Sequence, residues 1–121
     1  DESFPDQYLS HCDGRCSGMP HKVGTRVATL IAYCAVADVG GSTNFRQAGV
    51  HVKPQSGQAV FFSYMDPETH TMDHGETTHS GCPVYEGTKQ ILTQWLRYGV
   101  TKERTAQHFN TLGDYIGPTS D

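Results

Sequence analysis

The stretch His79-Ser-Gly-Cys-Pro-Val-Tyr-Glu-Gly-Thr-Lys89 is the part of the sequence that most strongly indicates the fold of the chain. It places an imidazole and an ammonium ten residues apart, with a proline and a Glu86-Gly87 turn between them. If His79 and Lys89 lie on neighbouring strands joined through that turn, both side chains can point into one cavity. A second imidazole and a carboxylate stand far upstream, in His11-Cys12-Asp13.

The three groups at His11, Asp13 and His79 suit a metal ion. If residues 7–13 form a short strand, Leu9, His11 and Asp13 face the same side, because alternate side chains of a strand point the same way. Two histidines and one carboxylate that leave other positions open are typical of non-haem Fe(II) oxygenases. Each part is common by chance in a chain with seven histidines, so it is the ordered combination that predicts a metal site.

Lys89 suits the binding of an anion in the same cavity. A small dicarboxylate could chelate the metal at one end and meet the Lys89 ammonium at the other. Such a charge-assisted hydrogen bond contributes roughly 1.5–3 kcal/mol. Taken alone, however, Lys89 is most simply a solvated surface charge.

Length and charge bound the class of protein. The chain has 121 residues, which favours a single domain over residues 1–121. A net charge of -4 argues against a broad basic surface for nucleic acid or anionic membrane. No apolar run approaches the roughly 20 residues needed to span a bilayer.

Short strands between glycine and proline turns dominate the pattern. Gln58–Met65 has the composition of a strand, and the turn at Pro54–Gly57 joins it to Val50–Lys53 as a hairpin. Lys89–Arg97 alternates in a way that suits another strand, while residues 66–78 are polar and are expected to form a loop. The pattern predicts an all-β sandwich or double-sheet jelly roll.

Three further segments are less regular. The apolar run 26–37 does not distinguish a buried strand from a buried helix, and its four alanines slightly favour a helix. Thr101–Leu112 is expected to be a C-terminal helix, with Thr101 as its N-cap. Gly117–Asp121 is expected to be a frayed tail.

The cysteines and the other histidines leave alternatives open. Four cysteines (Cys12, Cys16, Cys34 and Cys82) permit two disulfides in any of three pairings but do not demand them, and their spacing is not a zinc pattern. His70 and His74 could bind zinc from one helical face. Pro67 and Gly75 argue against a helix there, so a structural zinc domain is disfavoured.

Six segments, in the same order, resemble the catalytic domain of the prolyl 4-hydroxylases, within the Fe(II)- and 2-oxoglutarate-dependent dioxygenases. They are Gln7-Tyr8-x-x-His11-x-Asp13, Arg26-Val27-Ala28-Thr29-Leu30 with Tyr33, Gly40-Gly41-Ser42-Thr43-Asn44-Phe45, Val52-Lys53-Pro54-Gln55-Ser56-Gly57-Gln58-Ala59-Val60-Phe61-Phe62, His79-Ser80-Gly81-Cys82-Pro83-Val84 with Gly87 and Lys89, and Trp95. The resemblance covers about residues 7–97.

The resemblance implies a double-stranded β-helix, which is a jelly-roll variant, and a role for eight residues. The implied Fe(II) ligands are His11, Asp13 and His79; the implied contacts to 2-oxoglutarate are Lys89 and Thr43; the implied contacts to a peptide are Tyr8, Arg26 and Trp95. The last four have simpler readings. Tyr8 and Trp95 could be core aromatics, Arg26 an edge-strand charge and Thr43 a turn hydroxyl.

The activity implied by the resemblance is hydroxylation of peptidyl-proline at C4, coupled to decarboxylation of 2-oxoglutarate to succinate. It implies Fe(II), 2-oxoglutarate, O2 and ascorbate as cofactors and co-substrates, a proline-rich or collagen-like peptide as substrate, and a partner subunit as an option. With the even number of cysteines, it favours the endoplasmic reticulum lumen or the secretory pathway. No nucleic acid partner and no membrane span are expected.

The chain also departs from the family pattern. The family has strands, helices and a further 2-oxoglutarate-contacting tyrosine before its first metal ligand, whereas His11 stands near the start here, so an N-terminally truncated domain is expected. No cysteine follows Cys82, where collagen-type members often have one. Two alternatives therefore stand beside prolyl hydroxylation: the same oxygenase chemistry on another residue or a small molecule, and a non-catalytic domain that binds proline-rich peptides.

Overall fold

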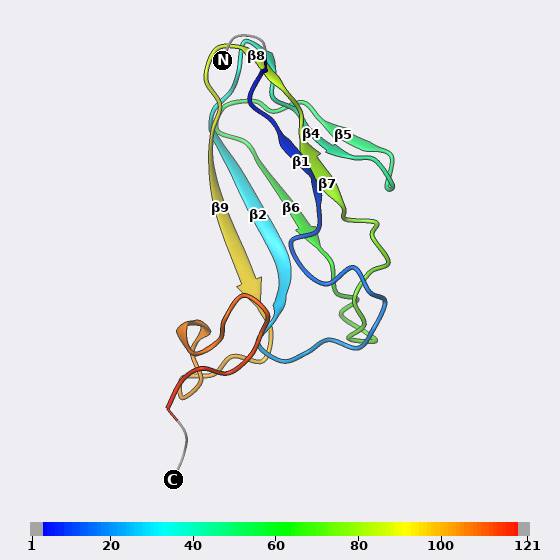
Figure 1. The fold of residues 1–121 in the computed structure, drawn as a ribbon, viewed down its shortest axis with the longest axis vertical. Coiled ribbons are helices and arrows are strands. Elements are labelled where there is room, and N and C mark those ends of the chain that lie inside the picture. The colour runs from blue at the N-terminus through cyan, green and yellow to red at the C-terminus, as the bar shows by residue number, and fades with distance from the viewer. Residues whose placement is uncertain (1–3, 119–121) are drawn as a thin grey trace.

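A computed structural model describes residues 4–118 and shows an almost wholly β structure (Figure 1). The strands are β1 (Tyr8–His11), β2 (Arg26–Ala35), β3 (Val39–Gly40), β4 (Thr43–Phe45), β5 (Val50–Val52), β6 (Ala59–Ser63), β7 (His79–Gly81), β8 (Val84–Glu86) and β9 (Gln90–Arg97), and one 3₁₀ turn, η1, spans Ala106–His108. No helix in the part of the chain that the structure describes has the length and apolar character needed to cross a membrane.

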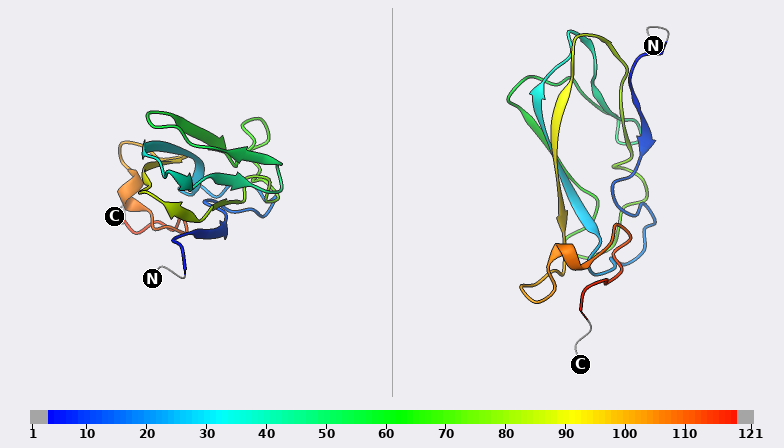
Figure 2. Two further views of the ribbon diagram at one scale, coloured as in Figure 1. Left: turned by 90° about the horizontal axis from the view of Figure 1, so that it is seen from above. Right: turned by 60° about the vertical axis from the view of Figure 1, so that its left-hand side comes forward.

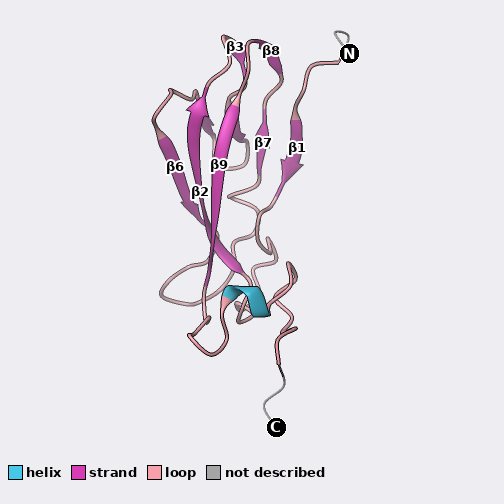
Figure 3. Cartoon of the chain, turned by 90° about the vertical axis from the view of Figure 1, so that its left-hand side faces the viewer, coloured by secondary structure: helices cyan, strands magenta, loops and turns pink. Residues whose placement is uncertain are grey.

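Two antiparallel sheets face each other (Figures 2 and 3). One has the strand order β1-β7-β4-β5 and the other the order β6-β2-β9, and the short β3-β8 ribbon lies at one end. Within residues 4–118 no strand pairing joins the two main sheets, so the sandwich is open rather than closed into a barrel. The predicted all-β, two-sheet fold is therefore confirmed.

The apolar run that begins at Arg26 is a strand, and the slight preference for a helix was wrong. β2 is the central strand of its sheet and pairs with β9 from Arg26 to Ala35 and with β6 from Ala28 to Ala32. Its side chains alternate, with Thr29, Ile31 and Tyr33 buried and Leu30 exposed between them. Pairing on both edges satisfies the backbone and outweighs the helix propensity of the alanines.

The core lies between the sheets and is mostly aromatic and sulfur-containing. Its buried members are Ile31, Tyr33, Phe45, Phe62, Tyr64, Met65 and Met72, with four valines packed against them. Phe45 from β4 meets Phe62 from β6 edge to face, with ring centroids 5.0 Å apart. This aromatic contact joins the two sheets on one side of the sandwich. Both rings also pack against His79.

The chain between His79 and Lys89 crosses from one sheet to the other. His79 begins β7 in the four-stranded sheet, whereas Lys89 immediately precedes β9 in the three-stranded sheet. The expectation that the two residues lie on neighbouring strands was therefore wrong. Between them the chain passes through β8, which pairs with β3, and through a turn at Gly87.

The expected C-terminal helix over Thr101–Leu112 is also absent from the described residues, where only the 3₁₀ turn forms. The backbone N–H of Thr101 donates to the carbonyl oxygen of Arg104, and its Oγ1 accepts from the backbone N–H of Arg104, in a tight turn instead of beginning a helix. Phe109 is buried and forms a β-bridge with Tyr115, which a helix through this segment would break. Residues 119–121 of the expected tail lie outside the described residues.

Candidate metal centre

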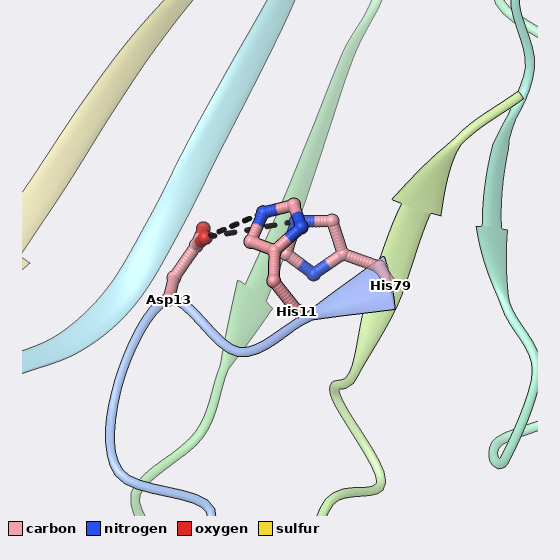
Figure 4. Close-up of side chains that lie close together, drawn as sticks. All are labelled: His11, Asp13 and His79. Carbon is pink, nitrogen blue, oxygen red and sulfur yellow. Dashed lines mark ion pairs between the residues drawn. The ribbon is translucent and has the colours of Figure 1, made fainter. Parts of the chain in front are cut away.

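Strand pairing brings the two histidines of the candidate site together. His11 ends β1, His79 begins β7, and the two residues are direct partners in the antiparallel pair. Asp13 follows two residues after β1 and turns its carboxylate toward both rings (Figure 4). Asp13 Oδ1 lies 3.3 Å from His11 Nε2 and 3.7 Å from His79 Nε2. One ligand atom from each residue lies within 4.8 Å of the others.

Backbone hydrogen bonds orient both imidazoles. The Nδ1 atom of His11 lies 2.7 Å from the carbonyl oxygen of Leu9, and that of His79 lies 3.0 Å from the carbonyl oxygen of Thr77. A carbonyl can only accept, so Nδ1 carries the hydrogen and the neutral ring presents the lone pair of Nε2. Both free Nε2 atoms face Asp13. Two imidazole nitrogens and one carboxylate oxygen fit a divalent transition metal such as Fe(II).

Burial of the triad is uneven. His79 is only 5% exposed and its ring packs against Phe45 and Phe62, with centroid distances of 5.3 Å and 4.9 Å. The Asp13 side chain is 9% exposed and that of His11 is 28% exposed. One side of the triad is therefore sealed by the core, and the other side opens toward a cavity.

The cavity has a volume of about 670 Å³ and lies between the sheets. All eight residues singled out from the sequence line it: Tyr8, His11, Asp13, Arg26, Thr43, His79, Lys89 and Trp95. They come from both sheets and from segments that are far apart in the chain, from β1 to β9. One half-open cavity therefore holds the candidate metal ligands, two cations and two aromatic side chains.

Lys89 presents a half-buried ammonium to this cavity. Burial lowers the pKa of Lys89 below the usual lysine value, and the nearby Cys82 partly opposes that shift. Within residues 4–118 no carboxylate forms an ion pair with it. The ring of Tyr33 lies 5.9 Å from Lys89 Nζ, and the Tyr33 hydroxyl is 2.7 Å from Thr43 Oγ1. A cation that lacks an acidic partner and lines the same cavity as Thr43 suits an incoming carboxylate.

A second cation lines the cavity on the β2–β9 side. The Arg26 guanidinium lies 3.9 Å from the ring centroid of Trp95, and its buried Nε has no hydrogen-bond partner. Trp95 is 43% exposed and Tyr8 is 65% exposed, so neither aromatic belongs to the core. The ring of Tyr8 instead meets that of His11 edge-on, with centroids 4.2 Å apart.

Three side chains at the site had no role assigned from the sequence. Thr29 donates to Asp13 Oδ2 at 2.8 Å, and Tyr64 hydrogen-bonds Thr29 at 3.1 Å. Burial raises the pKa of Tyr64 to about 12, so its hydroxyl stays protonated. Tyr33 supports Thr43 as described above. A hydroxyl in an otherwise apolar strand was a signal for Thr29 and Tyr33, since buried polar groups need partners. No such signal marked Tyr64.

The remaining cysteines and histidines form no second site. Cys12 and Cys16 form a disulfide, while Cys34 and Cys82 are free, so the pattern of two disulfides is not formed. Among residues 4–118 the triad is the only group of three or more histidine, cysteine or acidic ligand atoms this close together. His70 and His74 therefore do not build the alternative zinc site.

Comparison with known proteins places these residues in context. The family model described as the 2OG-Fe(II) oxygenase superfamily matches residues 3–97. The chain is 37% identical over 73 residues to prolyl 4-hydroxylase subunit alpha-1 of Gallus gallus, covering 60% of this chain and 14% of that one. It is 33% identical over 98 residues to probable prolyl 4-hydroxylase 3 of Arabidopsis thaliana, covering 65% of this chain and 33% of that one.

The chain also resembles a solved structure of a prolyl hydroxylase. The 2OG complex of the viral collagen prolyl hydroxylase vCPH from Paramecium Bursaria Chlorella virus-1 matches with a TM-score of 0.66 and 36% identity. The match covers 78% of this chain and 53% of the viral one. The chain thus spans a third or less of the two curated relatives and about half of the viral enzyme.

Proposed function

The chain belongs to the 2OG-Fe(II) oxygenase superfamily, and from that premise we propose that it hydroxylates peptidyl-proline at C4. In the proposed reaction one atom of O2 enters the prolyl ring and the other enters succinate, while 2-oxoglutarate loses CO2. The observation that carries the proposal is the single cavity of about 670 Å³, which is lined by the triad, by Lys89 and by the Arg26–Trp95 pair.

We propose that His11 Nε2, His79 Nε2 and Asp13 Oδ1 hold Fe(II), which supplies the redox chemistry when bound. The support lies in the donor atoms. Both Nε2 lone pairs are freed by the backbone bonds at Nδ1, and Asp13 directs one oxygen to the same point. The protein's part is to keep these three atoms on one sealed side, so that co-substrates enter only from the cavity.

Lys89 and Thr43 are the proposed contacts for the far carboxylate of 2-oxoglutarate. Lys89 is held half-buried without an acidic partner, so a carboxylate would satisfy a charge that burial disfavours. Thr43 can donate its hydroxyl to the same carboxylate if Tyr33 donates to Thr43 in turn, as their 2.7 Å contact allows. The keto-acid end would then point across the sandwich toward the triad.

Arg26, Trp95 and Tyr8 are the proposed contacts for a proline-rich or collagen-like peptide. Peptide carbonyls accept hydrogen bonds, and the Arg26 guanidinium that lines the cavity can donate them. Trp95 holds the guanidinium over its ring by a cation–π contact, and exposed aromatic side chains such as Tyr8 suit prolyl rings. The names of the relatives, two prolyl 4-hydroxylases and a collagen prolyl hydroxylase, support this substrate class.

The proposal extends to the compartment, to ascorbate and to a partner subunit. Disulfides persist in oxidising compartments, so the Cys12–Cys16 bond supports the endoplasmic reticulum lumen or the secretory pathway. Alkylation of protein isolated from its native source, followed by mass spectrometry, tests whether that bond is present.

Ascorbate is proposed as the reductant that restores oxidised iron, and its omission should stop turnover early. Co-purification from the same source tests for the partner subunit.

Turnover tests the proposal directly. The chain is incubated with Fe(II), 2-oxoglutarate, ascorbate and a proline-rich collagen-like peptide, and succinate and oxygenated peptide are measured together. We expect equal amounts of both, and NMR should place the new hydroxyl on C4 of proline. Succinate without peptide product would point to another substrate. Binding of metal, 2-oxoglutarate and peptide without any succinate would contradict the enzymatic proposal and favour the binding domain.

A further inference from the structure

The two oxygens of Asp13 lie in different surroundings. Oδ1 faces the two imidazoles, at 3.3 Å and 3.7 Å from their Nε2 atoms (Figure 4). Oδ2 accepts the hydroxyl of Thr29 from β2, at 2.8 Å. Since Thr29 has no exposed surface, water cannot take the place of this hydroxyl. The carboxylate is therefore held at one oxygen by the protein and presented to the candidate metal position by the other.

Proton counting gives the direction of the adjoining hydrogen bond. A threonine hydroxyl has one hydrogen, and Thr29 gives it to Asp13 Oδ2, because an ionised carboxylate can only accept. The Tyr64 hydroxyl, 3.1 Å from Thr29 Oγ1, must then be the donor in that contact. The chain runs Tyr64 to Thr29 to Asp13, with each hydrogen bond polarising the next. All of it lies in the buried side of the sandwich.

Tyr64 also contacts the backbone next to Asp13. A Cβ atom added at Gly14 would come within 2.3 Å and 2.4 Å of two ring carbons of Tyr64. The tyrosine ring therefore lies directly on Gly14, while its hydroxyl reaches Asp13 through Thr29. With 1% of its surface exposed, Tyr64 cannot swing away without opening the core.

We propose that Thr29 and Tyr64 are positioning residues that restrict Asp13 to one-oxygen ligation of the metal ion. The inference rests on the metal site of the proposed function and goes beyond it. An ion held by three protein atoms keeps three of six positions open, whereas a carboxylate that binds through both oxygens takes one of them away. By engaging Oδ2, the two hydroxyls preserve the position that co-substrates need.

Metal binding by conservative variants tests the inference without relying on turnover. Thr29→Val keeps the shape of the side chain and Tyr64→Phe keeps the ring, and each removes one hydroxyl. We expect Thr29→Val to weaken Mn(II) binding by about 10- to 100-fold, as loss of a partner behind a metal ligand typically does. Tyr64→Phe should weaken it less, because Thr29 remains. Thr29→Ser, which keeps the hydroxyl, should restore the affinity of the unaltered chain.

A matched control separates positioning from general stability. Thr25 is also buried, and its hydroxyl donates to the carbonyl of Lys22 at 2.6 Å, away from the triad. Thr25→Val should therefore lower the thermal midpoint without changing Mn(II) affinity. The visible absorption of Co(II) bound to each protein reports the coordination number, and we expect it to change in Thr29→Val and Tyr64→Phe only.

The outcomes separate the two proposals. If the unaltered chain binds no Mn(II) or Co(II), the metal site itself is wrong and both proposals are overturned. If the unaltered chain binds and Thr29→Val and Tyr64→Phe match it in affinity and Co(II) spectrum, the site stands and the positioning role is overturned. Loss of affinity in Thr25→Val equal to that in Thr29→Val would also overturn it.

Discussion

His79 is the residue at which the candidate metal centre and the hydrophobic core meet. Its Nε2 faces Asp13, and its ring packs against Phe45 and Phe62. His11 supplies the same chemical group from a more exposed position. Substitution of the two histidines should therefore have the same effect on metal binding and different effects on stability.

We expect His79→Ala and His11→Ala both to abolish stoichiometric Mn(II) binding. His79→Ala also leaves a space beside two phenylalanines, and we expect it to lower the free energy of unfolding by about 2 kcal/mol or more. His11→Ala should lower it by less, because its side chain is 28% exposed. Urea denaturation and electron paramagnetic resonance of free Mn(II) measure the two effects. Full Mn(II) binding by His79→Ala would remove His79 from the site.

We expect the proposed contact with Lys89 to make 2-oxoglutarate binding dependent on pH. Burial places the pKa of Lys89 in the folded protein below the usual 10.5, and only the charged form attracts a carboxylate. Binding is therefore complete at neutral pH and weakens as pH rises through that lowered pKa, before a free lysine would lose its proton. Bound dicarboxylate shifts the pKa back upward by the same linkage.

Titration of 2-oxoglutarate with Mn(II) present, between about pH 7 and pH 9.5, measures this dependence, with the usual lysine pKa of 10.5 as reference. Lys89→Arg is the matched control, because a guanidinium keeps its charge throughout this range. We expect the affinity of the unaltered chain to fall with pH and that of Lys89→Arg to stay level. A level profile for both would show that the Lys89 charge does not hold the anion.

At the residue scale, the candidate ligands were easier to predict than the residues that hold them in position. His11, Asp13, His79 and Lys89 could be singled out because their side-chain types are unusual and their order is specific. The hydroxyl of Thr29 indicated a buried polar group but not its partner, and Tyr64 gave no signal. The link from Tyr64 through Thr29 to Asp13 depends on which side of β2 faces inward and on where residues 64–78 pack. Such tertiary facts are not contained in local pattern.

At the scale of elements, the strand β2 shows what a sequence pattern can predict and what it cannot. Its inner row, Thr29, Ile31 and Tyr33, touches Asp13, the core and Thr43 in turn. The alternation that produces this row is present in the sequence, but alanines and a continuous apolar run obscured it. The C-terminal helix failed for the opposite reason, since a good N-cap signal at Thr101 was outweighed by the burial of Phe109.

The Gly87 turn between β8 and β9 carries the chain across the sandwich and sets the approach to Lys89. Gly87 has a φ of 83°, and an added Cβ would lie 2.7 Å from Asp38 Oδ2 and 2.8 Å from Asp38 N. Gly57 has the same φ of 83° with no atom within 4 Å of an added Cβ. Substitutions at the two glycines therefore distinguish the effect of backbone strain from that of a clash with Asp38.

We expect Gly87→Ala and Gly57→Ala both to lower the free energy of unfolding, by about 1–2 kcal/mol from left-handed strain. Gly87→Ala should in addition displace the turn from Asp38 and weaken 2-oxoglutarate binding several-fold, with Mn(II) affinity unchanged. Calorimetric titration and thermal unfolding measure these effects. Equal 2-oxoglutarate affinity in both variants would show that the Gly87 turn does not position Lys89.

At the scale of the whole molecule, the two-sheet architecture followed from the strand pattern, but the path of the chain between the sheets did not. Local alternation predicts strands without stating which strands pair. The antiparallel pairing of β1 with β7, which are far apart in the chain, is what brings His11 opposite His79. The resemblance to a family implied that His11 and His79 share a metal ion, but the strand pairing itself was not predicted.

The outer face of the β6-β2-β9 sheet is apolar and exposed. Leu30, Phe61, Leu92 and Leu96 are between 37% and 67% exposed, and strand register places them on the side opposite the cavity. Exposed apolar side chains gathered on one face of a sheet promote association. We expect the isolated chain to self-associate at micromolar concentration, and Phe61→Lys with Leu92→Lys to shift it to monomer with unchanged Mn(II) affinity.

Sedimentation velocity measures that association over a range of protein concentrations. Phe4→Lys is a suitable control, because Phe4 is 77% exposed and lies before β1, outside the β6-β2-β9 sheet. It should leave association unchanged. A monomeric unaltered chain at all concentrations, or equal dissociation by the control, would contradict the role of the sheet face.

The coupling between Mn(II) and 2-oxoglutarate tests most directly that one cavity holds both. If the triad and Lys89 grip opposite ends of one molecule, each ligand tightens the other by the same factor. Calorimetric titration should show 2-oxoglutarate binding at least about tenfold tighter with Mn(II) than without it, which is a coupling of about 1.4 kcal/mol. His79→Ala should abolish the coupling, while Lys89→Ala should weaken binding and keep it. Equal 2-oxoglutarate affinity with and without Mn(II) in the unaltered chain would contradict a shared site.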